Sequence, residues 1–351
     1  MIGPSRSGRA AYRDVPLYAT EPMRCDIDLS DNTNLWGAPP SAQEAIHDIA
    51  NGAFTRYPSA YALELKEALA AYAGVDRSRI VTGCGSDDVL ASAIRALAEP
   101  GESLAFSAPT FTMIPVFAQI NGVVPVSVPM TPSWDIDPEA LIATDARIIY
   151  VCSPNNPTGT CVSREALERL IAIAPGVVIL DQAYAEFADE PLPELVAASD
   201  RVLVVRTMSK AFGLAGLRIG YAVGAPAVVA EVEKSRGPYK VSVAAERAAL
   251  AVLANDRAWV AARVTEARIS RDRLAESLRK LGLAPLPSQA NFVLVPVRNA
   301  ADVARRMRTH GIAVRAFEGL PSIGDALRIT AGPPPMMERA IDALERALEC
   351  A

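Results

Sequence analysis

The sequence ARIIYVCSPNNPTGTCVSREALERLIAIAPGVVILDQAY, residues 146–184, contains the pattern that decides the fold. Two short runs within it, IIYV and VVIL, are continuously apolar, which is typical of strands that are buried on both faces. Between them, SREALERLIAIA has the apolar spacing of a helix. A strand, a helix and a second strand in this order indicate a parallel pair of strands joined by a helical crossover.

The same alternation extends over most of the chain between residues 79 and 209. We expect strands at 79–83, 103–109, 123–129, 146–154, 176–184 and 201–209. We expect helices at 41–53, 61–74, 87–101, 110–122, 137–144, 163–174 and 192–199, the first with Ser41 as its N-cap and the second ending at Gly74. The sequence therefore predicts an α/β fold with a mostly parallel sheet that is covered by helices on both faces.

The pattern changes near residue 255, where a long helix is expected over 256–282. Apolar runs and helical stretches then follow at 290–297, 301–311, 312–317 and 325–332, before a terminal helix. This second pattern predicts a smaller α+β domain. We therefore expect an N-terminal arm at 1–40, a large domain at 41–254 and a small domain at 255–351, with the arm associated with the small domain or with a partner subunit.

Composition and charge argue against several classes of protein. Half of the 351 residues are hydrophobic, and the formal net charge is −5. No extended basic stripe supports nucleic-acid binding. No apolar stretch approaches the roughly 18 to 20 residues of a membrane span, and the N-terminus lacks the apolar region of a signal peptide.

The cysteine and histidine content narrows the chemistry. The five cysteines include no Cys-x-x-Cys pair, which favours reduced thiols and a cytoplasmic protein. The chain has only two histidines, which argues against a His-rich metal site and against a Ser-His-Asp triad. Acid–base work is therefore expected from lysine, tyrosine or carboxylate groups.

Polar side chains follow three of the expected buried strands. Asn155 or Asn156 follows the first, Asp181 with Tyr184 the second, and Ser209 with Lys210 the third. Each group alone has a structural alternative, because Asp181 could cap a helix and NNPTG could be only a turn. Since ligands of open parallel sheets bind beyond the carboxyl ends of the strands, the three groups together predict one shared site.

A fourth element is the turn TGCGSDDVL, which follows an expected strand and opens an expected helix. The N–H groups around Gly85, Ser86 and Asp87 would point outward at the start of that helix, where an anion binds readily. Such turns can also be simple connections. The turn is neither a P-loop, since no Lys-Ser/Thr follows, nor a full Gly-x-Gly-x-x-Gly, since Asp88 holds the last position.

A lysine, an aspartate and a phosphate-binding turn are the groups that pyridoxal phosphate chemistry requires. The lysine forms a Schiff base with the aldehyde of the cofactor. A carboxylate beside the pyridine nitrogen keeps the ring protonated and therefore electron-withdrawing. A lysine that is neutral at working pH can also move the proton of the substrate, and burial near a cation favours the neutral form.

The motifs SPNNPTG, DQAYAEF, TMSKAFGLAGLRIGY and GCGSDDVL, in this order, resemble those of class I/II pyridoxal-phosphate-dependent aminotransferases of fold type I. The histidinol-phosphate aminotransferase branch is the closest match, and RYP, PTF, ANFVLV, VRAF and LRITAG extend the resemblance over nearly the whole chain. The resemblance implies a large domain with a mostly parallel sheet of the seven-stranded type, a smaller α+β domain and a homodimer with shared active sites.

The resemblance also assigns roles at the cofactor. It implies that Lys210 is the Schiff-base lysine and proton shuttle, and that Asp181 pairs with the pyridine nitrogen. Asn156 and Tyr184 would hydrogen-bond the phenolic oxygen, and Phe111 would stack on the ring. The residues implied to hold the phosphate are Gly85, Ser86, Asp87, Thr207, Ser209 and Arg218.

Further roles concern the substrate and the second subunit. Tyr57 would reach the phosphate bound by the neighbouring subunit, although a tyrosine before proline can also be an ordinary extended residue. Arg328 would bind the substrate carboxylate or the phosphate of histidinol phosphate, with Asn34 and Arg315 nearby. No metal is implied.

Three departures from the family pattern leave the amino donor open. Leu35 stands where the family has proline, Lys240 where it often has asparagine, and the run from Pro333 to Pro335 where a charged helix start is common. We expect transfer of an amino group between histidinol phosphate and 2-oxoglutarate. Alternatives are an aromatic amino acid aminotransferase, a decarboxylase of the threonine-phosphate decarboxylase type, and a catalytically silent protein that binds pyridoxal phosphate.

Overall fold

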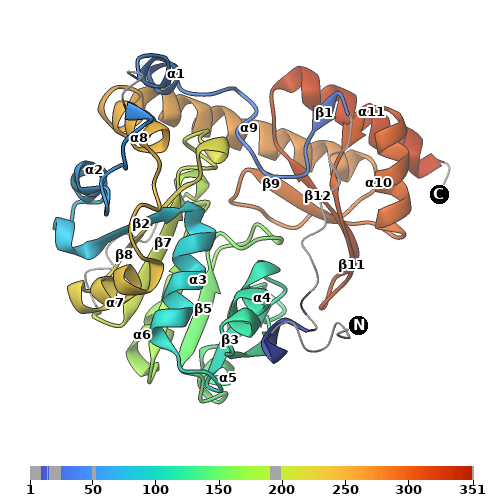
Figure 1. Cartoon of the computed structure of the whole chain (residues 1–351). Coiled ribbons are helices and arrows are strands. Elements are labelled where there is room, and N and C mark those ends of the chain that lie inside the picture. Colours follow the sequence, from blue (N-terminus) through green and yellow to red (C-terminus); the bar gives the residue numbers. More distant parts are fainter. Residues whose placement is uncertain (1–8, 14, 16–24, 50–52, 190–198, 350–351) are drawn as a thin grey trace, which may run out of the picture.

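A computed structural model describes residues 9–13, 15, 25–49, 53–189 and 199–349 of the chain (Figure 1). The expected helix at 192–199 lies, except for Ser199, outside these residues, as does much of the expected N-terminal arm. Among the described helices, none is long and apolar enough to cross a membrane.

The larger sheet has seven strands in the order β2-β8-β7-β6-β5-β3-β4. Their bounds are Ile80–Cys84 (β2), Ser103–Ala108 (β3), Val124–Pro129 (β4), Ile148–Cys152 (β5), Val177–Asp181 (β6), Val202–Thr207 (β7) and Ile219–Val223 (β8). All are mutually parallel except β8, which runs antiparallel to both of its neighbours. The expected α/β fold is confirmed, but β8 had no counterpart among the expected strands.

Helices cover both faces of this sheet. They are α1 (Pro40–His47), α2 (Leu63–Ala73), α3 (Gly85–Leu97), α4 (Met113–Ile120), α5 (Pro138–Ile142), α6 (Arg164–Ile173), α7 (Pro226–Arg236) and α8 (Val243–Asn255). Successive residues of β5 alternate between two hydrophobic clusters, since Ile149 and Val151 join one while Ile148 and Tyr150 join the other. This alternation explains why the strand is apolar at every position.

The C-terminal part forms a separate hydrophobic cluster beside the larger sheet (Figure 1). Its antiparallel sheet has the order β11-β12-β9, from strands Arg315–Leu320, Gly324–Thr330 and Phe292–Pro296. Helices α10 (Ala300–Thr309) and α11 (Pro334–Glu349) pack with it. Helix α9 (Arg257–Lys280) contributes Val260 and Val264 to the core of the larger sheet and Leu274 and Leu278 to this cluster, so it connects the two parts.

A short segment near the N-terminus joins the C-terminal part. Strand β1 (Ile27–Asp28) pairs in parallel with β10 (Ile312–Ala313), and Leu29 is fully buried in the same cluster. The chain then runs above the larger sheet, near α9 in the view of Figure 1, before α1 begins. This path brings residues 31–34 to the region between the two sheets.

Three local predictions differ from the structure. The first expected helix, 41–53, ends already at His47. Ser41 is not the N-cap of α1, because the helix begins at Pro40 and the Ser41 hydroxyl instead donates to Asp256 Oδ2 at 2.6 Å. The run 312–317 is not one strand, because Val314 separates β10 from β11, which belong to different sheets. Gly74 does end α2, in the left-handed conformation that favours glycine.

Candidate active site

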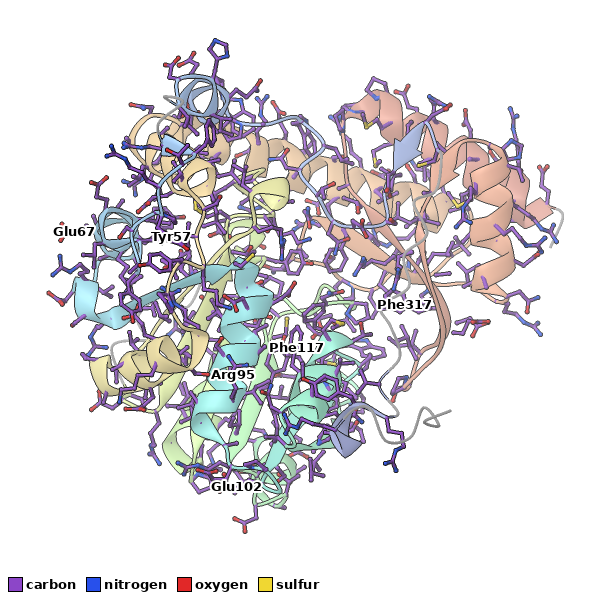
Figure 2. All side chains as sticks on the ribbon, in the orientation of Figure 1. Tyr57, Glu67, Arg95, Glu102, Phe117 and Phe317 are labelled. Atoms are coloured by element: carbon purple, nitrogen blue, oxygen red, sulfur yellow. The ribbon has the colours of Figure 1, made fainter. Side chains whose placement is uncertain are left out.

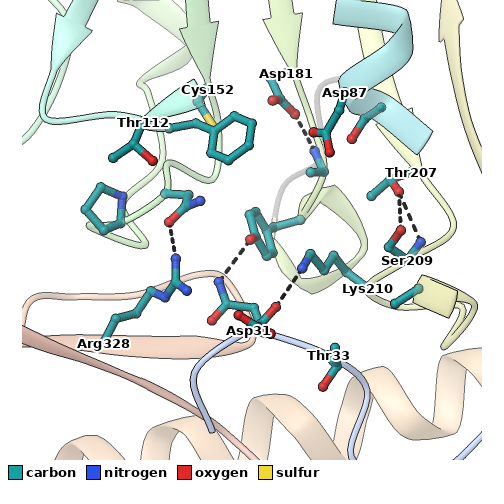
Figure 3. A pocket seen from close by; sticks show the side chains of 18 of the residues that line it. Asp31, Thr33, Asp87, Thr112, Cys152, Asp181, Thr207, Ser209, Lys210 and Arg328 are labelled. Atoms are coloured by element: carbon teal, nitrogen blue, oxygen red, sulfur yellow. Dashed lines mark hydrogen bonds between the residues drawn. The ribbon is translucent and has the colours of Figure 1, made fainter. Parts of the chain in front are cut away.

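A cavity of about 350 Å³ lies at the carboxyl ends of β5, β6 and β7, facing the β11–β12 hairpin (Figure 3). It is closed by residues 31–33 and by the start of α3. Of the residues singled out in the sequence, those that line it are Ser86, Asp87, Phe111, Asn156, Asp181, Tyr184, Thr207, Ser209, Lys210, Arg218, Arg315 and Arg328. The parallel sheet therefore brings the three polar strand ends together.

Lys210 projects into this cavity from the turn after β7 (Figure 3). Its Nζ donates to the carbonyl oxygen of Asp31 at 2.8 Å and lies 5.9 Å from the centre of the Tyr184 ring. Removal from water, assisted by the Arg328 cation, lowers the pKa of this amine to about 8 from an ordinary 10.5. A sizeable neutral fraction therefore exists near neutral pH, and the neutral amine is the reactive form.

Asp181 ends β6 and is buried to 4% exposure. Its Oδ2 accepts a hydrogen bond from the Tyr150 hydroxyl at 2.8 Å, and its Oδ1 accepts one from the Ala183 N–H at 3.0 Å. Burial raises the pKa of this carboxyl to about 6, while the Tyr150 and Ala183 hydrogen bonds oppose the rise. The group is thus a buried carboxylate that is mostly ionised at neutral pH and faces the ligand space.

The start of α3, with Ser86 and Asp87, forms one corner of the cavity, called the α3 corner below. Gly85 has φ +79°, and a Cβ there would lie 2.3 Å from Arg218 Nη2, so the turn requires glycine. A Cβ at Gly220 would lie 2.2 Å from the Ser86 nitrogen, so the neighbouring strand also needs glycine. Gly85 shapes this corner through its backbone and is not among the cavity-lining residues.

Hydroxyl groups and an arginine complete this corner. The Thr207 hydroxyl donates to Ser209 Oγ at 2.9 Å and the Ser209 N–H donates back to Thr207 at 3.1 Å. Arg218 Nη2 lies 3.2 Å from Asp87 Oδ2. A helix N-terminus beside a guanidinium and two hydroxyls suits a phosphate group.

The opposite wall carries two arginines. Arg328 on β12 and Arg315 on β11 are directly paired across the two strands, and both line the cavity. Arg328 is 8% exposed, donates to Asn156 Oδ1 at 2.6 Å, and has its guanidinium between the Phe292 and Phe317 rings at 5.4 and 5.7 Å. Two cations on one wall, separated by the cavity from the α3 corner, indicate a second anionic group on the ligand.

The residues before α1 contain a site residue that the sequence analysis did not assign. Asn32 lines the cavity and its Nδ2 donates to the Tyr184 hydroxyl at 3.0 Å, whereas Asn34, which was assigned, is not among the lining residues. Asn34 instead bonds the Ala211 carbonyl at 3.2 Å and accepts from the Trp36 N–H at 3.0 Å, which fixes the loop. The left-handed φ of Asn32, +55°, is a conformation in which asparagine is enriched among non-glycine residues, and of the two asparagines in the Asn-Thr-Asn stretch only Asn34 was assigned a role from the sequence.

Tyr57 lies on the outer surface, away from the cavity (Figure 2). Its side chain is 84% exposed and stacks on Tyr239, with ring centres 4.9 Å apart. Within one chain it reaches no ligand space. Its expected contact with a partner subunit stays a prediction.

The three departures from the family pattern lie outside the cavity lining. Leu35 packs in the C-terminal cluster, in contact range of Gly332. Lys240 forms an ion pair with Asp88 at 3.3 Å. Pro334 begins α11, where a proline is well tolerated because its missing N–H has no partner in the first turn.

Comparison with known proteins agrees with this geometry. The family model for aminotransferases of class I and II matches residues 25–344. The aromatic amino acid aminotransferase of Corynebacterium glutamicum is 38% identical over 88% of this chain and 92% of its own, and the histidinol-phosphate aminotransferase of Methanosarcina mazei is 36% identical over 96% and 92%. The solved histidinol-phosphate aminotransferase of Sinorhizobium meliloti, in complex with pyridoxal-5'-phosphate, superposes with a TM-score of 0.83 at 28% identity, over 93% of this chain and 92% of that one. The chain belongs to the class I and II aminotransferase family.

Proposed function

We propose that this aminotransferase binds pyridoxal phosphate in the cavity and moves an amino group between histidinol phosphate and 2-oxoglutarate. The observation that carries the proposal is the convergence of Lys210, Asp181 and the α3 corner on one cavity, with Arg315 and Arg328 on its opposite wall. The first three groups match the cofactor, and the two arginines match an anionic substrate.

The cavity fits pyridoxal phosphate group by group. The α3 corner with Thr207, Ser209 and Arg218 offers donors for the phosphate, and Asp181 is a buried acceptor for the protonated pyridine nitrogen. Phe111 offers a face for the ring. When bound, the cofactor supplies an electron sink for the carbon that carries the amino group.

The protein's own groups then have separate tasks. Lys210 would hold the cofactor covalently, and its amine, once released, would carry the proton between substrate and cofactor carbons. Tyr184, with a hydroxyl held by Asn32, and Asn156, with an oxygen held by Arg328, would donate to the phenolic oxygen. Each donor is fixed by a second residue, which is the arrangement that favours a defined ligand geometry.

Two substrates compete for the arginine wall. A phosphate with its two negative charges would use both Arg315 and Arg328, which favours histidinol phosphate. The ring of Phe317, which lines the cavity beside Arg328, together with the C. glutamicum relative, favours an aromatic amino acid as the second candidate. We further propose that the enzyme is a homodimer in which the exposed Tyr57 completes the partner's phosphate site.

A half-reaction screen tests the proposed function. The holoenzyme is mixed with histidinol phosphate, phenylalanine, tyrosine, glutamate or threonine phosphate, and conversion to the pyridoxamine form is followed by the loss of visible absorbance. We expect the fastest conversion with histidinol phosphate, and reversal on adding 2-oxoglutarate. Faster conversion with an aromatic amino acid would show that such an amino acid, and not histidinol phosphate, is the preferred substrate. Release of carbon dioxide would show that the enzyme is a decarboxylase and not an aminotransferase acting on histidinol phosphate.

The Arg328→Gln variant should lower kcat/KM for histidinol phosphate about 100-fold, because a buried charged contact to the substrate is lost. Arg315 is more exposed, so Arg315→Gln should cost about tenfold. The matched comparison is histidinol, which lacks the phosphate. Arg328→Gln should lower its kcat/KM much less, through the lost contact with Asn156 alone. An equal loss with both substrates would show that Arg328 shapes the cavity without binding the phosphate. Arg305→Gln, at an exposed helix position, is the control.

A further inference from the structure

A buried tyrosine, Tyr150, stands behind Asp181 on the neighbouring strand. In the parallel register, Cys152 of β5 pairs with Asp181 of β6 and Tyr150 pairs with Ile179, so all four residues share one face of the sheet. The Tyr150 side chain is 1% exposed and extends toward the carboxyl end of the sheet, where its hydroxyl donates to Asp181 Oδ2 at 2.8 Å.

Toward the Asp181 carboxylate, the Tyr150 hydroxyl acts as a donor at working pH. Burial, reinforced by the nearby Asp181 charge, holds the pKa of its phenol well above the ordinary value of 10. A hydroxyl that keeps its proton stabilises the charged form of the carboxylate that it faces. Among the described residues, the Tyr150 hydroxyl is the side chain that donates a hydrogen bond to the Asp181 carboxylate, and the other donor is the Ala183 backbone N–H.

The remaining groups around Asp181 do not replace this donor. The Asp87 carboxylate destabilises its charge, and the Lys210 amine stabilises it without a hydrogen bond. Burial keeps the Cys152 thiol protonated, and its Sγ donates to the Pro154 carbonyl. The titratable groups that face Asp181 are therefore Tyr150 and Cys152 from β5, Asp87 from α3, Tyr184 from the turn after β6, and Lys210 from the turn after β7.

We infer that Tyr150 is a positioning residue that keeps the Asp181 carboxylate ionised and turned toward the cavity. Each carboxylate oxygen can accept more than one hydrogen bond, so the Tyr150 and Ala183 contacts leave an acceptor for a protonated ring nitrogen. Losing the hydroxyl would raise the pKa of Asp181 further above the value of about 6 that burial already gives it. The inference rests on the role that we propose for Asp181.

The test is the Tyr150→Phe variant, which removes one oxygen and keeps the ring. Because the folded-state pKa of Asp181, about 6, lies above the ordinary 3.8, ionising this group costs stability as the pH rises through 6. A further rise of about one pKa unit in Tyr150→Phe makes that cost larger at pH 8 than at pH 5. Urea unfolding of the full chain without cofactor measures this cost. The unfolding equilibrium constant of Tyr150→Phe, divided by that of the wild type, should be about tenfold larger at pH 8 than at pH 5.

The matched control is Tyr221→Phe. Tyr221 lies on β8 of the same sheet and is also 1% exposed, so this variant likewise removes one buried hydroxyl. Because Tyr221 lies near Glu186, whose pKa is also raised by burial, both variants are compared in a Glu186→Gln background. There the gap between Tyr221→Phe and its parent should not widen between pH 5 and pH 8. In the holoenzyme, Tyr150→Phe should lower kcat up to about tenfold with little change in KM, because the ring nitrogen holds its proton less firmly. A gap for Tyr150→Phe that is the same at pH 5 and pH 8, or one that Tyr221→Phe reproduces, would overturn the inference. The unfolding measurement needs no cofactor, so its outcome is separate from that of the half-reaction screen.

Discussion

The Lys210→Ala variant should lose the visible absorbance that borohydride abolishes in the wild-type enzyme, and its kcat should fall by about 10⁴-fold or more. Two functions disappear together, since the same amine holds the cofactor and moves the proton. The α3 corner and Asp181 remain, so the variant should still bind pyridoxal phosphate without the covalent link. Absorbance spectra, mass measurement after borohydride treatment and single-turnover kinetics check the three points.

The control is Lys234→Ala, at an exposed position on α7 where the lysine pairs with Glu231 of the same helix. It should keep the wild-type spectrum and kcat. The pH dependence gives a further check, because the Lys210 pKa of about 8 means that the reactive neutral amine accumulates as the pH rises through 8. The rate at which the cofactor-free enzyme takes up pyridoxal phosphate should rise over that range and then level off. A borohydride-stable link that persists in Lys210→Ala would refute the assignment of this lysine.

The larger sheet could be predicted from the sequence because its strands are buried on both faces and joined by helices. β5, β6 and β7 each contain a run of at least four apolar residues, and the polar residues that come after each run mark the edge of the sheet. β8 was missed, although it is as buried as its neighbours, because only the lysine turn and a single 3-10 turn, Ala215–Leu217, separate it from β7, with no α-helix in between. A rule based on strand–helix alternation cannot detect an antiparallel return strand.

The cofactor half of the site was easier to predict than the substrate half. Lys210, Asp181 and Ser86 lie next to regular elements whose direction fixes where they point. Asn32 and Asn34 lie in an irregular segment, where only the tertiary path shows which of the two reaches Tyr184. The pairing of Arg315 with Arg328 depends on the register of a hairpin with a bulge, and sequence spacing does not specify that register.

Arg206, in the lysine motif, had no role that its sequence context suggested, and the structure gives it one in stability. Its guanidinium lies on the side of β7 away from the cavity, where it binds Gln182 Oε1 through Nε and Nη2 at 3.2 and 2.7 Å. Glu186 Oε1 lies 3.6 Å away, and the two charged side chains are only 15% and 11% exposed. Since Gln182 and Glu186 flank Tyr184 in the turn, Arg206 holds both ends of this turn against β7.

The Arg206→Met variant should lose about 3 to 5 kcal/mol of unfolding free energy at pH 8, because Glu186 would remain buried without its cation. Burial already raises the pKa of Glu186, and Arg206 opposes the rise, so removing Arg206 raises that pKa further. A raised folded-state pKa means that stability falls as the pH increases through it, so the loss should be smaller at pH 5 than at pH 8. Urea unfolding of the holoenzyme at the two pH values measures both effects.

Two further variants separate the buried charge from the lost packing. In Arg206→Met with Glu186→Gln no charge remains buried, so most of the stability at pH 8 should return and the difference between pH 5 and pH 8 should shrink. The exposed pair Arg169 and Glu139, at 57% and 63% exposure, provides the surface comparison, and Arg169→Met should cost less than about 1 kcal/mol. The double variant could instead be as unstable as Arg206→Met at both pH values. The unpaired charge of Glu186 would then not cause the loss of stability, which would come from the packing of the Arg206 methylene groups and from the Gln182 contact.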